Sequence, residues 1–218
     1  MLQAHIRAGG GRFRGVRHST AWDAEPEHRH LRRGDWPARD AAARNSAPGS
    51  RVSPRSACRS TPGSSPQLAD AVDLARSFPD ANIILGHVGG PLGYGPYAGK
   101  RDEVYAAWKA GIVELATCPN VTMKLGGMMM RLAAFDYGAA AAPIASSELA
   151  ALWRPYIEPC IERFGANRCM FESNFPVDKM GIGYGPLWNA LKRIAAGASA
   201  EEKLALFSGT ARRVYRLE

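Results

Sequence analysis

Long apolar runs are missing from this sequence, and cysteines are scarce among its 218 residues. No stretch reaches the roughly 18 apolar residues that a membrane-spanning helix needs, and the N-terminus lacks the apolar segment of a signal peptide. The four cysteines show neither CxxC pairing nor metal-ligand spacing: Cys58, Cys118, Cys160 and Cys169. We therefore expect a cytoplasmic protein with no disulfide framework and no membrane partner.

Lysine is absent from the first 65 residues, where 12 arginines and five acidic residues give a net charge of +7. Residues 66–218 hold 16 basic and 15 acidic residues, a net charge of +1. The formal charge of +8 therefore belongs to one segment of the chain and does not describe the protein as a whole.

Aliphatic residues are nearly absent from residues 27–65, which are rich in Arg, Ala, Pro, Ser and Gly and show no helical or strand period. The simplest interpretation is a disordered basic linker. We favour a different interpretation, in which this segment of the gene is read out of frame. When permitted codons for residues 47–64 are read one base earlier, they encode a helix end, a turn and an apolar strand. If residues 27–65 are out of frame, they are not a nucleic-acid-binding tail, and no nucleic-acid partner is expected.

Alternating helical and strand patterns fill residues 66–218. Helices are expected at 67–78, 101–117 and 147–164, from 187, and from a capping box that starts at 199. Short apolar strands are expected at 81–87, 120–125 and 168–173. This alternation predicts βα units around a parallel sheet, and three such units are too few to close a barrel.

Four strand segments resemble, in the correct order, those of the amidohydrolase-related family of metal-dependent hydrolases. Segments 84–91, 120–126 and 168–177 are similar to its sixth, seventh and eighth strand motifs, and 12–18 to its fourth. The resemblance implies an α/β fold, a partial (β/α)8 TIM barrel with roughly strands 4 to 8. It divides the chain into a barrel remnant at 1–26, an irregular segment at 27–65 and the C-terminal part of the barrel at 66–218.

Within that resemblance, His87 is expected to be a metal ligand or an acid–base group, because residues after the strands of such a barrel face its active site. Lys124 lies in an otherwise apolar strand, where an unpaired charge is costly, so it either reaches the barrel mouth or pairs with Glu172 or Asp178. Snorkelling of Lys124 from a strand edge is equally compatible with the sequence.

At the eighth strand the family generally carries an aspartate that binds metal and activates water, whereas this sequence has Asn174. An asparagine cannot act as a base, although its carbonyl can orient water. Glu172 and Asp178 flank it and are further catalytic candidates. Glu172 shares a side with Asn174 only if the strand stays regular.

Arg17, His18, Lys124 and Tyr94 are the expected substrate-binding residues. Tyr94 lies in segment 93–98, which matches a G-x-G-x-x-A pattern but follows its strand too distantly for nucleotide binding. The resemblance implies a divalent metal, zinc above all. Zinc needs three or four protein ligands, and Ser65 stands where the fifth-strand histidine is expected, so the site is incomplete.

The function implied is hydrolysis of a small carboxylate, lactone or amide, impaired in this chain. A decarboxylase of the same fold is one alternative. A non-catalytic half-barrel fragment is another, and its exposed strand edges favour homo-oligomerisation. In either enzyme the partner is a small-molecule substrate.

Overall fold

The computed structural model describes residues 2–19, 57–61, 65–93, 95–129 and 142–217. Its centre is a five-stranded parallel sheet in the order β1-β2-β3-β4-β5. The strands are β1 Gly15–Ser19, β2 Ala57–Thr61, β3 Ile83–Leu85, β4 Val121–Leu125 and β5 Cys169–Phe171. Strand order thus follows chain order, as in successive strands of a (β/α)8 barrel. The fold is α/β, with a partial barrel.

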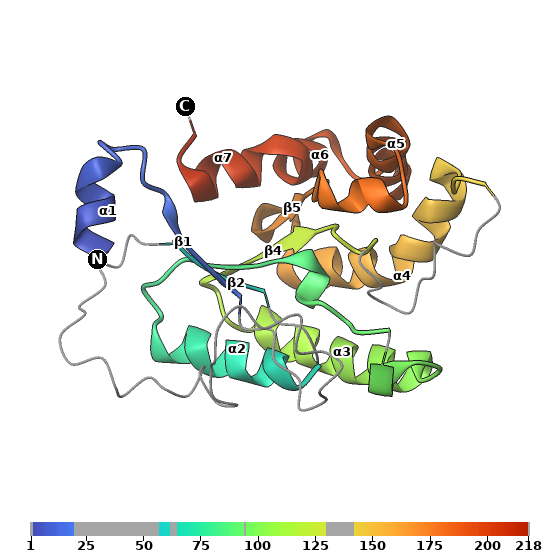
Figure 1. Ribbon diagram of the computed structural model, residues 1–218, viewed down its shortest axis with the longest axis horizontal. Coiled ribbons are helices and arrows are strands. Elements are labelled where there is room, and N and C mark those ends of the chain that lie inside the picture. The colour runs from blue at the N-terminus through green and yellow to red at the C-terminus, as the bar shows by residue number, and fades with distance from the viewer. Residues whose placement is uncertain (1, 20–56, 62–64, 94, 130–141, 218) are drawn as a thin grey trace.

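Helices cover both faces of this sheet, with α2 and α3 on one side and α6 and α7 on the other (Figure 1). The α-helices are α1 Leu2–Ala8, α2 Ser65–Ser77, α3 Arg101–Ala116, α4 Ser146–Phe164, α5 Tyr184–Ile194, α6 Ala200–Leu204 and α7 Thr210–Tyr215. Shorter turns are η3 His87–Gly89, η4 Gly95–Tyr97, η5 Ala166–Arg168 and η6 Val177–Met180, and a π-helical turn, η7 Ala205–Gly209, joins α6 to α7. None of the described helices is both long and apolar enough to cross a bilayer.

Strand β2 lies within the segment for which we expected no regular structure. Residues 57–61 pair in register with β1 and then with β3, so the strand occupies the place of a fifth barrel strand. Backbone hydrogen bonds in a sheet can be supplied by any non-proline residue, so these five residues pair despite their polar composition, and the division of the chain at 27–65 stays a prediction. The out-of-frame hypothesis for residues 27–65 stays a prediction.

The expected helices and strands lie close to their predicted positions, with shorter strands. Helix α5 begins at Tyr184, three residues before the expected start, and Pro186 fits its first turn because the missing N–H needs no partner there. The capping box is confirmed, since Ser199 Oγ accepts the Glu202 N–H and Glu202 Oε2 accepts the Ser199 N–H. Three buried cysteines are free thiols: Cys118, Cys160 and Cys169.

The apolar core lies mainly between the sheet and helices α2 to α5, around fully buried side chains such as Trp108 and Trp153. On the opposite face Ile84 and Met170 form a smaller cluster with Val214 of α7. Packing on both faces explains why the strands are almost continuously apolar. A polar residue in these strands therefore needs a particular explanation.

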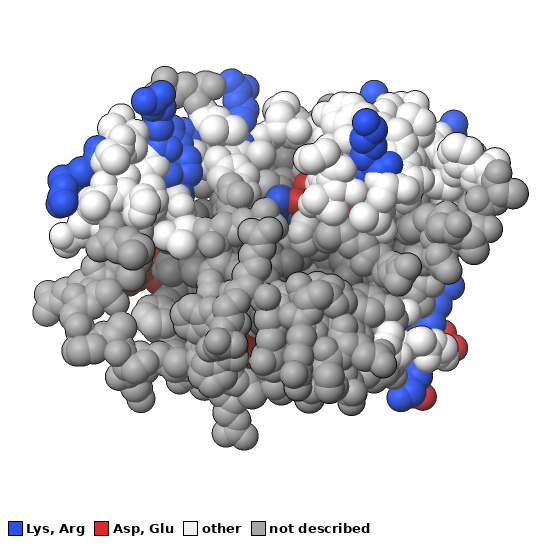
Figure 2. All heavy atoms as spheres, viewed as in Figure 1, with Lys and Arg blue, Asp and Glu red and all other residues white. Residues whose placement is uncertain are grey.

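Lysine and arginine side chains gather, on the face seen in Figure 2, over α1 and the C-terminal end of the chain. Arg216 Nη2 there donates to the carbonyl of Phe13 at 3.1 Å, tying α7 to the N-terminal segment. Strands β1 and β5 are the outermost described strands, so each has one edge unpaired within the described sheet. Self-association through these edges stays a prediction.

Candidate active site

The chain leaves β3 through a strained turn that carries His87. His87 and Val88 have positive φ values of 53° and 49°, which are unfavourable for residues with a Cβ and above all for β-branched Val88. Trp108 Nε1 of α3 donates to the Val88 carbonyl at 2.7 Å. His87 is 4% exposed. The turn therefore holds a histidine firmly at the carboxyl edge of the sheet, where we predicted it.

Glu172 follows β5 and is the partner of that histidine. Its Oε1 lies 2.7 Å from His87 Nδ1 and accepts the His87 backbone N–H at 3.0 Å. Glu172 is 8% exposed, and such burial raises the pKa of a carboxyl. The hydrogen bond and charge of His87, with those of Lys124, outweigh burial and lower the pKa of Glu172 from 4.5 to about 2. Glu172 is therefore ionised at neutral pH.

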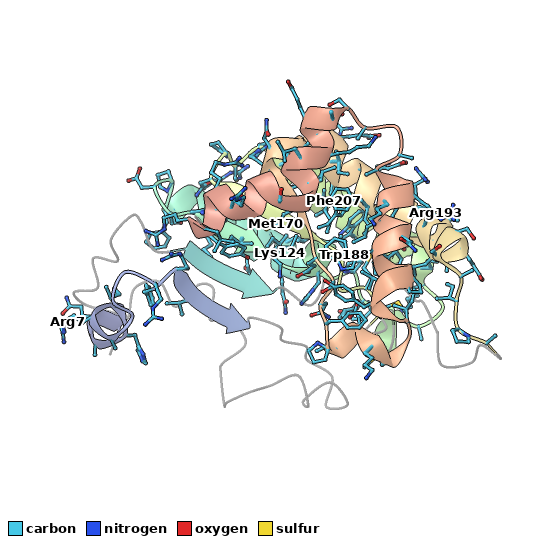
Figure 3. The ribbon with its side chains drawn as sticks, turned by 90° about the horizontal axis from the view of Figure 1, so that it is seen from above. Arg7, Lys124, Met170, Trp188, Arg193 and Phe207 are labelled. Atoms are coloured by element: carbon cyan, nitrogen blue, oxygen red, sulfur yellow. The ribbon has the colours of Figure 1, made fainter. Side chains whose placement is uncertain are left out.

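Lys124 of β4 is the third member of this group. Its Nζ contacts the second carboxylate oxygen, Oε2, of Glu172. Its side chain is 23% exposed, against 7% for Glu172, so the ammonium lies nearer to solvent. Figure 3 marks Lys124 among the strands. Of the two partners predicted for Lys124, the structure selects Glu172 and leaves Asp178 to another contact.

Two glycines after β4 allow these groups to approach one another. Gly126 has a φ of 149° and Gly127 a φ of 70°. A Cβ on Gly126 would collide with the Glu172 carbonyl, and one on Gly127 would collide with the His87 ring. These two glycines were not predicted to belong to the site, although a Gly-Gly pair directly after a strand was an available signal.

Asn174 and Asp178 form a second polar pair beside the first. Asn174 has a φ of 53°, so the chain does not continue as a regular strand after Phe171. Asn174 Nδ2 donates to Asp178 Oδ1 at 2.7 Å. Asp178 is fully buried, and its Oδ2 has no hydrogen-bond partner within the described structure.

Burial raises the pKa of Asp178 from 3.8 to about 6, against the lowering effect of hydrogen bonds from Asn174 and from the backbone of Met129. The charges of His87 and Glu172 also act on the pKa of Asp178, in opposite directions. Side chains that follow β3 and β5, together with the backbone of Met129 after β4, therefore all act on the same carboxyl group. An acidic group with a pKa near neutrality is suited to proton transfer.

The predicted substrate-binding residues other than Lys124 are placed only in part. Arg17 and His18 lie in β1, and across β2 they stand in register with Ile84 and Leu85 respectively. Their side chains fall outside the described part of the structure, and so does Tyr94. The roles assigned to these residues stay predictions.

A metal site is not complete among the described residues. No three His, Cys, Asp or Glu side chains come together there in an arrangement that could hold an ion. One carboxylate oxygen of Glu172 faces the Lys124 ammonium, and the other faces the Nδ1 of His87. Because zinc needs three or four protein ligands, these residues do not fit a zinc site, and no chemical step is assigned to a metal here.

Comparison with known proteins places the chain in a family. The model of the amidohydrolase family matches residues 2–217. An uncharacterised protein of Sinorhizobium fredii, y4mH, is 37% identical over 151 residues, which cover 69% of this chain and 44% of that protein. An L-fucono-1,5-lactonase of Burkholderia multivorans is 31% identical over 159 residues, 68% of this chain and 51% of the relative. The chain thus spans about half the length of these curated relatives.

The fold is shared with solved structures. A crystal structure of an amidohydrolase from Burkholderia multivorans with bound HEPES has a TM-score of 0.73 and 23% identity, over 100% of this chain and 70% of that one. A second crystal form with bound zinc has a TM-score of 0.71, with the same identity and coverage. These likenesses concern the fold, while the family model extends over nearly all of the sequence. The chain therefore belongs to the amidohydrolase family.

Proposed function

We propose that this chain carries the strand-end part of an active site that hydrolyses a small sugar-acid lactone. The observation that carries the proposal is the group of Lys124, Glu172 and His87 at the carboxyl ends of β4, β5 and β3. It occurs in a chain that is 31% identical to an L-fucono-1,5-lactonase over 68% of its own length. In (β/α)8 barrels the active site usually lies at the carboxyl ends of the strands, which is where these charged, mutually paired side chains are found.

Opening a lactone requires water to add to the carbonyl carbon and the ring C–O bond to break. One proton leaves the attacking water, and one reaches the ring oxygen. His87 is suited to transfer this proton from the water to the ring oxygen, because an imidazole nitrogen can accept a proton from one group and donate it to another. Glu172, 2.7 Å from its Nδ1, orients the ring and stabilises its protonated form.

Lys124 supplies the complementary charge. As water adds, the carbonyl oxygen gains negative charge, and a fixed cation lowers the energy of that state. Lys124 is the most exposed of the three side chains and remains anchored by Glu172, so its ammonium is held in place before the substrate arrives. The same charge favours substrates that carry a carboxylate.

A reduced rate is part of the proposal. Asn174 stands where the family resemblance implies a water-activating aspartate, and its amide cannot accept a proton from water. Its amide nitrogen is engaged by Asp178. We therefore expect slow hydrolysis compared with relatives that have an acid at this position.

The test is to assay the full chain with L-fucono-1,5-lactone, following the acid released on ring opening. His87→Gln should reduce the rate by about 100-fold or more, since general acid–base groups contribute that much. Lys124→Met should lower kcat for this lactone, because it removes the fixed cation beside the carbonyl oxygen, whereas Lys192→Met, at an exposed lysine of α5, should leave both kcat and KM unchanged. Unaltered hydrolysis in His87→Gln would contradict the proposal.

Two other outcomes correspond to the alternative functions. Release of carbon dioxide from a carboxylate substrate, with no ring opening of lactones, would indicate the decarboxylase. Absence of both activities in the folded chain would support the non-catalytic half-barrel fragment.

A further inference from the structure

The side chain of Asn174 presents an oxygen that no group of the described structure uses. Its Nδ2 donates to Asp178 Oδ1 at 2.7 Å, so the amide oxygen of Asn174 is directed away from Asp178. This oxygen accepts no hydrogen bond within the described residues, and it is not enclosed as the Oδ2 of Asp178 is. Asn174 as a whole is half-buried. The residue therefore offers a free acceptor that a ligand can reach.

The contact with Asp178 fixes which end of the amide faces outward. A carboxylate accepts hydrogen bonds and donates none, so the NH2 end of Asn174 must face it and the oxygen must face the other way. Asp178 is fully buried, which holds this anchor in place. Because the second oxygen of Asp178 is enclosed, a ligand meets Asn174 and not Asp178. Asp178 is thus a positioning residue for the amide.

The backbone at Asn174 also fixes the direction of its side chain. The φ of 53° lies in the left-handed region, which asparagine tolerates better than most residues with a Cβ. Ser173 Oγ accepts the backbone N–H of Phe175 at 3.3 Å and so holds the turn on both sides of Asn174. The acceptor is therefore presented by a defined turn.

This acceptor lies beside the group that we propose for hydrolysis. Asn174 follows Glu172 by two residues at the end of β5. Its anchor Asp178 lies close enough to His87 and Glu172 for the charges of both to act on its carboxyl group. A ring bound next to His87 and Glu172 therefore comes within reach of Asn174.

We infer that the side-chain oxygen of Asn174 accepts a hydrogen bond from a hydroxyl group of the substrate, and that the site thereby prefers hydroxylated rings to rings of the same size without hydroxyls. The inference rests on the proposed function for the class of substrate. A hydroxyl that leaves water needs a new partner, and a neutral amide oxygen supplies one. A site that offers such an acceptor disfavours an analogue that lacks the hydroxyl, because the acceptor is then left unpaired.

Ligand binding tests the inference without any measurement of hydrolysis. L-Fucose carries ring hydroxyls but no ester bond, and tetrahydropyran is a ring of the same size without hydroxyls. Dissociation constants of the full chain are measured by ligand-observed NMR. We expect tetrahydropyran to bind the wild type about tenfold more weakly than L-fucose, or not at all. Asn174→Gly removes the acceptor, tolerates the positive φ, and should weaken L-fucose binding about 3- to 10-fold, the effect of one hydrogen bond.

Three further variants separate a ligand contact from a structural role. In Asn174→Asp the two neighbouring carboxyl groups share a proton and an outward oxygen still accepts, so L-fucose should bind at least as tightly as to the wild type. Asp178→Ala removes the positioning carboxylate and should weaken L-fucose binding as Asn174→Gly does. Asn189→Gly makes the same exchange at an exposed asparagine of α5 and should leave L-fucose binding unchanged.

Equal affinity of the wild type for L-fucose and tetrahydropyran would overturn the inference. So would L-fucose binding that is unaltered in Asn174→Gly. If Asn174→Gly does not fold, unaltered L-fucose binding in Asp178→Ala would overturn it equally.

These outcomes are distinguishable from failure of the proposed hydrolysis. A chain that binds L-fucose through Asn174 but opens no lactone would refute the hydrolysis and leave the hydroxyl contact standing. Lactone hydrolysis with the same KM in the wild type and in Asn174→Gly would do the reverse.

Discussion

Glu172 Oε1 lies 2.7 Å from His87 Nδ1 and accepts the His87 backbone N–H at 3.0 Å, although 85 residues separate the two in the chain. The carboxylate therefore fixes both the ring and the backbone of the histidine. Lys124 on the other carboxylate oxygen links β4 to the same centre. The buried side chain of Glu172 thus joins the ends of β3, β4 and β5. The stability of this edge of the sheet should therefore depend on the charge of Glu172.

The acid stability of the protein should depend on Glu172. The pKa of this group is lower in the folded state, about 2, than its ordinary value of 4.5. Ionised Glu172 therefore stabilises the fold above about pH 4.5, and this contribution disappears as the pH falls towards 2. A shift of this size corresponds to about 3 kcal/mol. Glu172→Gln should lower the free energy of unfolding near neutral pH and flatten its acid dependence, as measured by urea unfolding.

The matched control is Glu201→Gln, an exposed glutamate in the first turn of α6. It should leave the acid dependence of unfolding almost unchanged, because exposed charges contribute little. An equally steep acid transition in Glu172→Gln would show that Glu172 does not carry this dependence.

Local periodicity was sufficient to predict helices α2 to α5 and the start of α6, whereas α1 was not predicted. Helix α3 was expected at 101–117 and spans Arg101–Ala116, because its apolar stripe and the following Pro119 are local signals. Strand ends could not be predicted as well. The strand expected at 81–87 ends at Leu85, because His87 and Val88 turn to positive φ where Trp108, from a later helix, holds the Val88 carbonyl.

The sequence indicated which residues belong to the candidate site, but it did not indicate which of them contact one another. An unpaired lysine in an apolar strand is costly, and this indicated that Lys124 either reaches the barrel mouth or pairs with a carboxylate, with snorkelling from a strand edge equally compatible. The choice between Glu172 and Asp178 depends on how the chain turns at Asn174, whose φ of 53° no local pattern specifies. The two-sided contact of Glu172 with His87 likewise depends on the close approach of strands far apart in the sequence.

Asp178 should destabilise the fold at neutral pH. The folded state raises its pKa from 3.8 to about 6, mainly through burial, so the folded protein favours the protonated form. Stability is therefore lost as the pH rises from about 4 to about 6. Asp178→Asn keeps the bond from Asn174 and removes the buried charge. It should stabilise the protein by about 3 kcal/mol near neutral pH and by little at about pH 3.

Thermal and urea unfolding at these two pH values measure the difference, and Asp80→Asn at an exposed turn is the control. A variant that is more stable and yet hydrolyses lactones more slowly would indicate that Asp178 is retained for function. Destabilisation by Asp178→Asn at neutral pH would contradict the prediction.

The hydrogen bond from Trp108 should stabilise the strained turn after β3. Trp108→Phe removes the donor to the buried Val88 carbonyl and should cost about 1–3 kcal/mol, in addition to the smaller ring. Trp188→Phe is a useful comparison, because the Trp188 Nε1 is buried without a hydrogen-bond partner in the described structure. Urea unfolding should therefore show a larger loss for Trp108→Phe, and equal losses would argue against the bond.

Gly127 should be required for the placement of His87. Gly127 and Gly99 have similar positive φ values, 70° and 74°, so an alanine at either position meets the same backbone strain of about 1 kcal/mol. Only at Gly127 does the added Cβ collide with the His87 ring, whereas nothing lies within 4 Å of a Cβ at Gly99. Gly127→Ala should therefore displace the imidazole and reduce lactone hydrolysis by about tenfold or more, as for a misplaced catalytic group. Gly99→Ala should lose only stability. Nitrogen NMR of the His87 ring checks the displacement directly, and an unchanged ring signal in Gly127→Ala would show that the ring does not depend on this glycine.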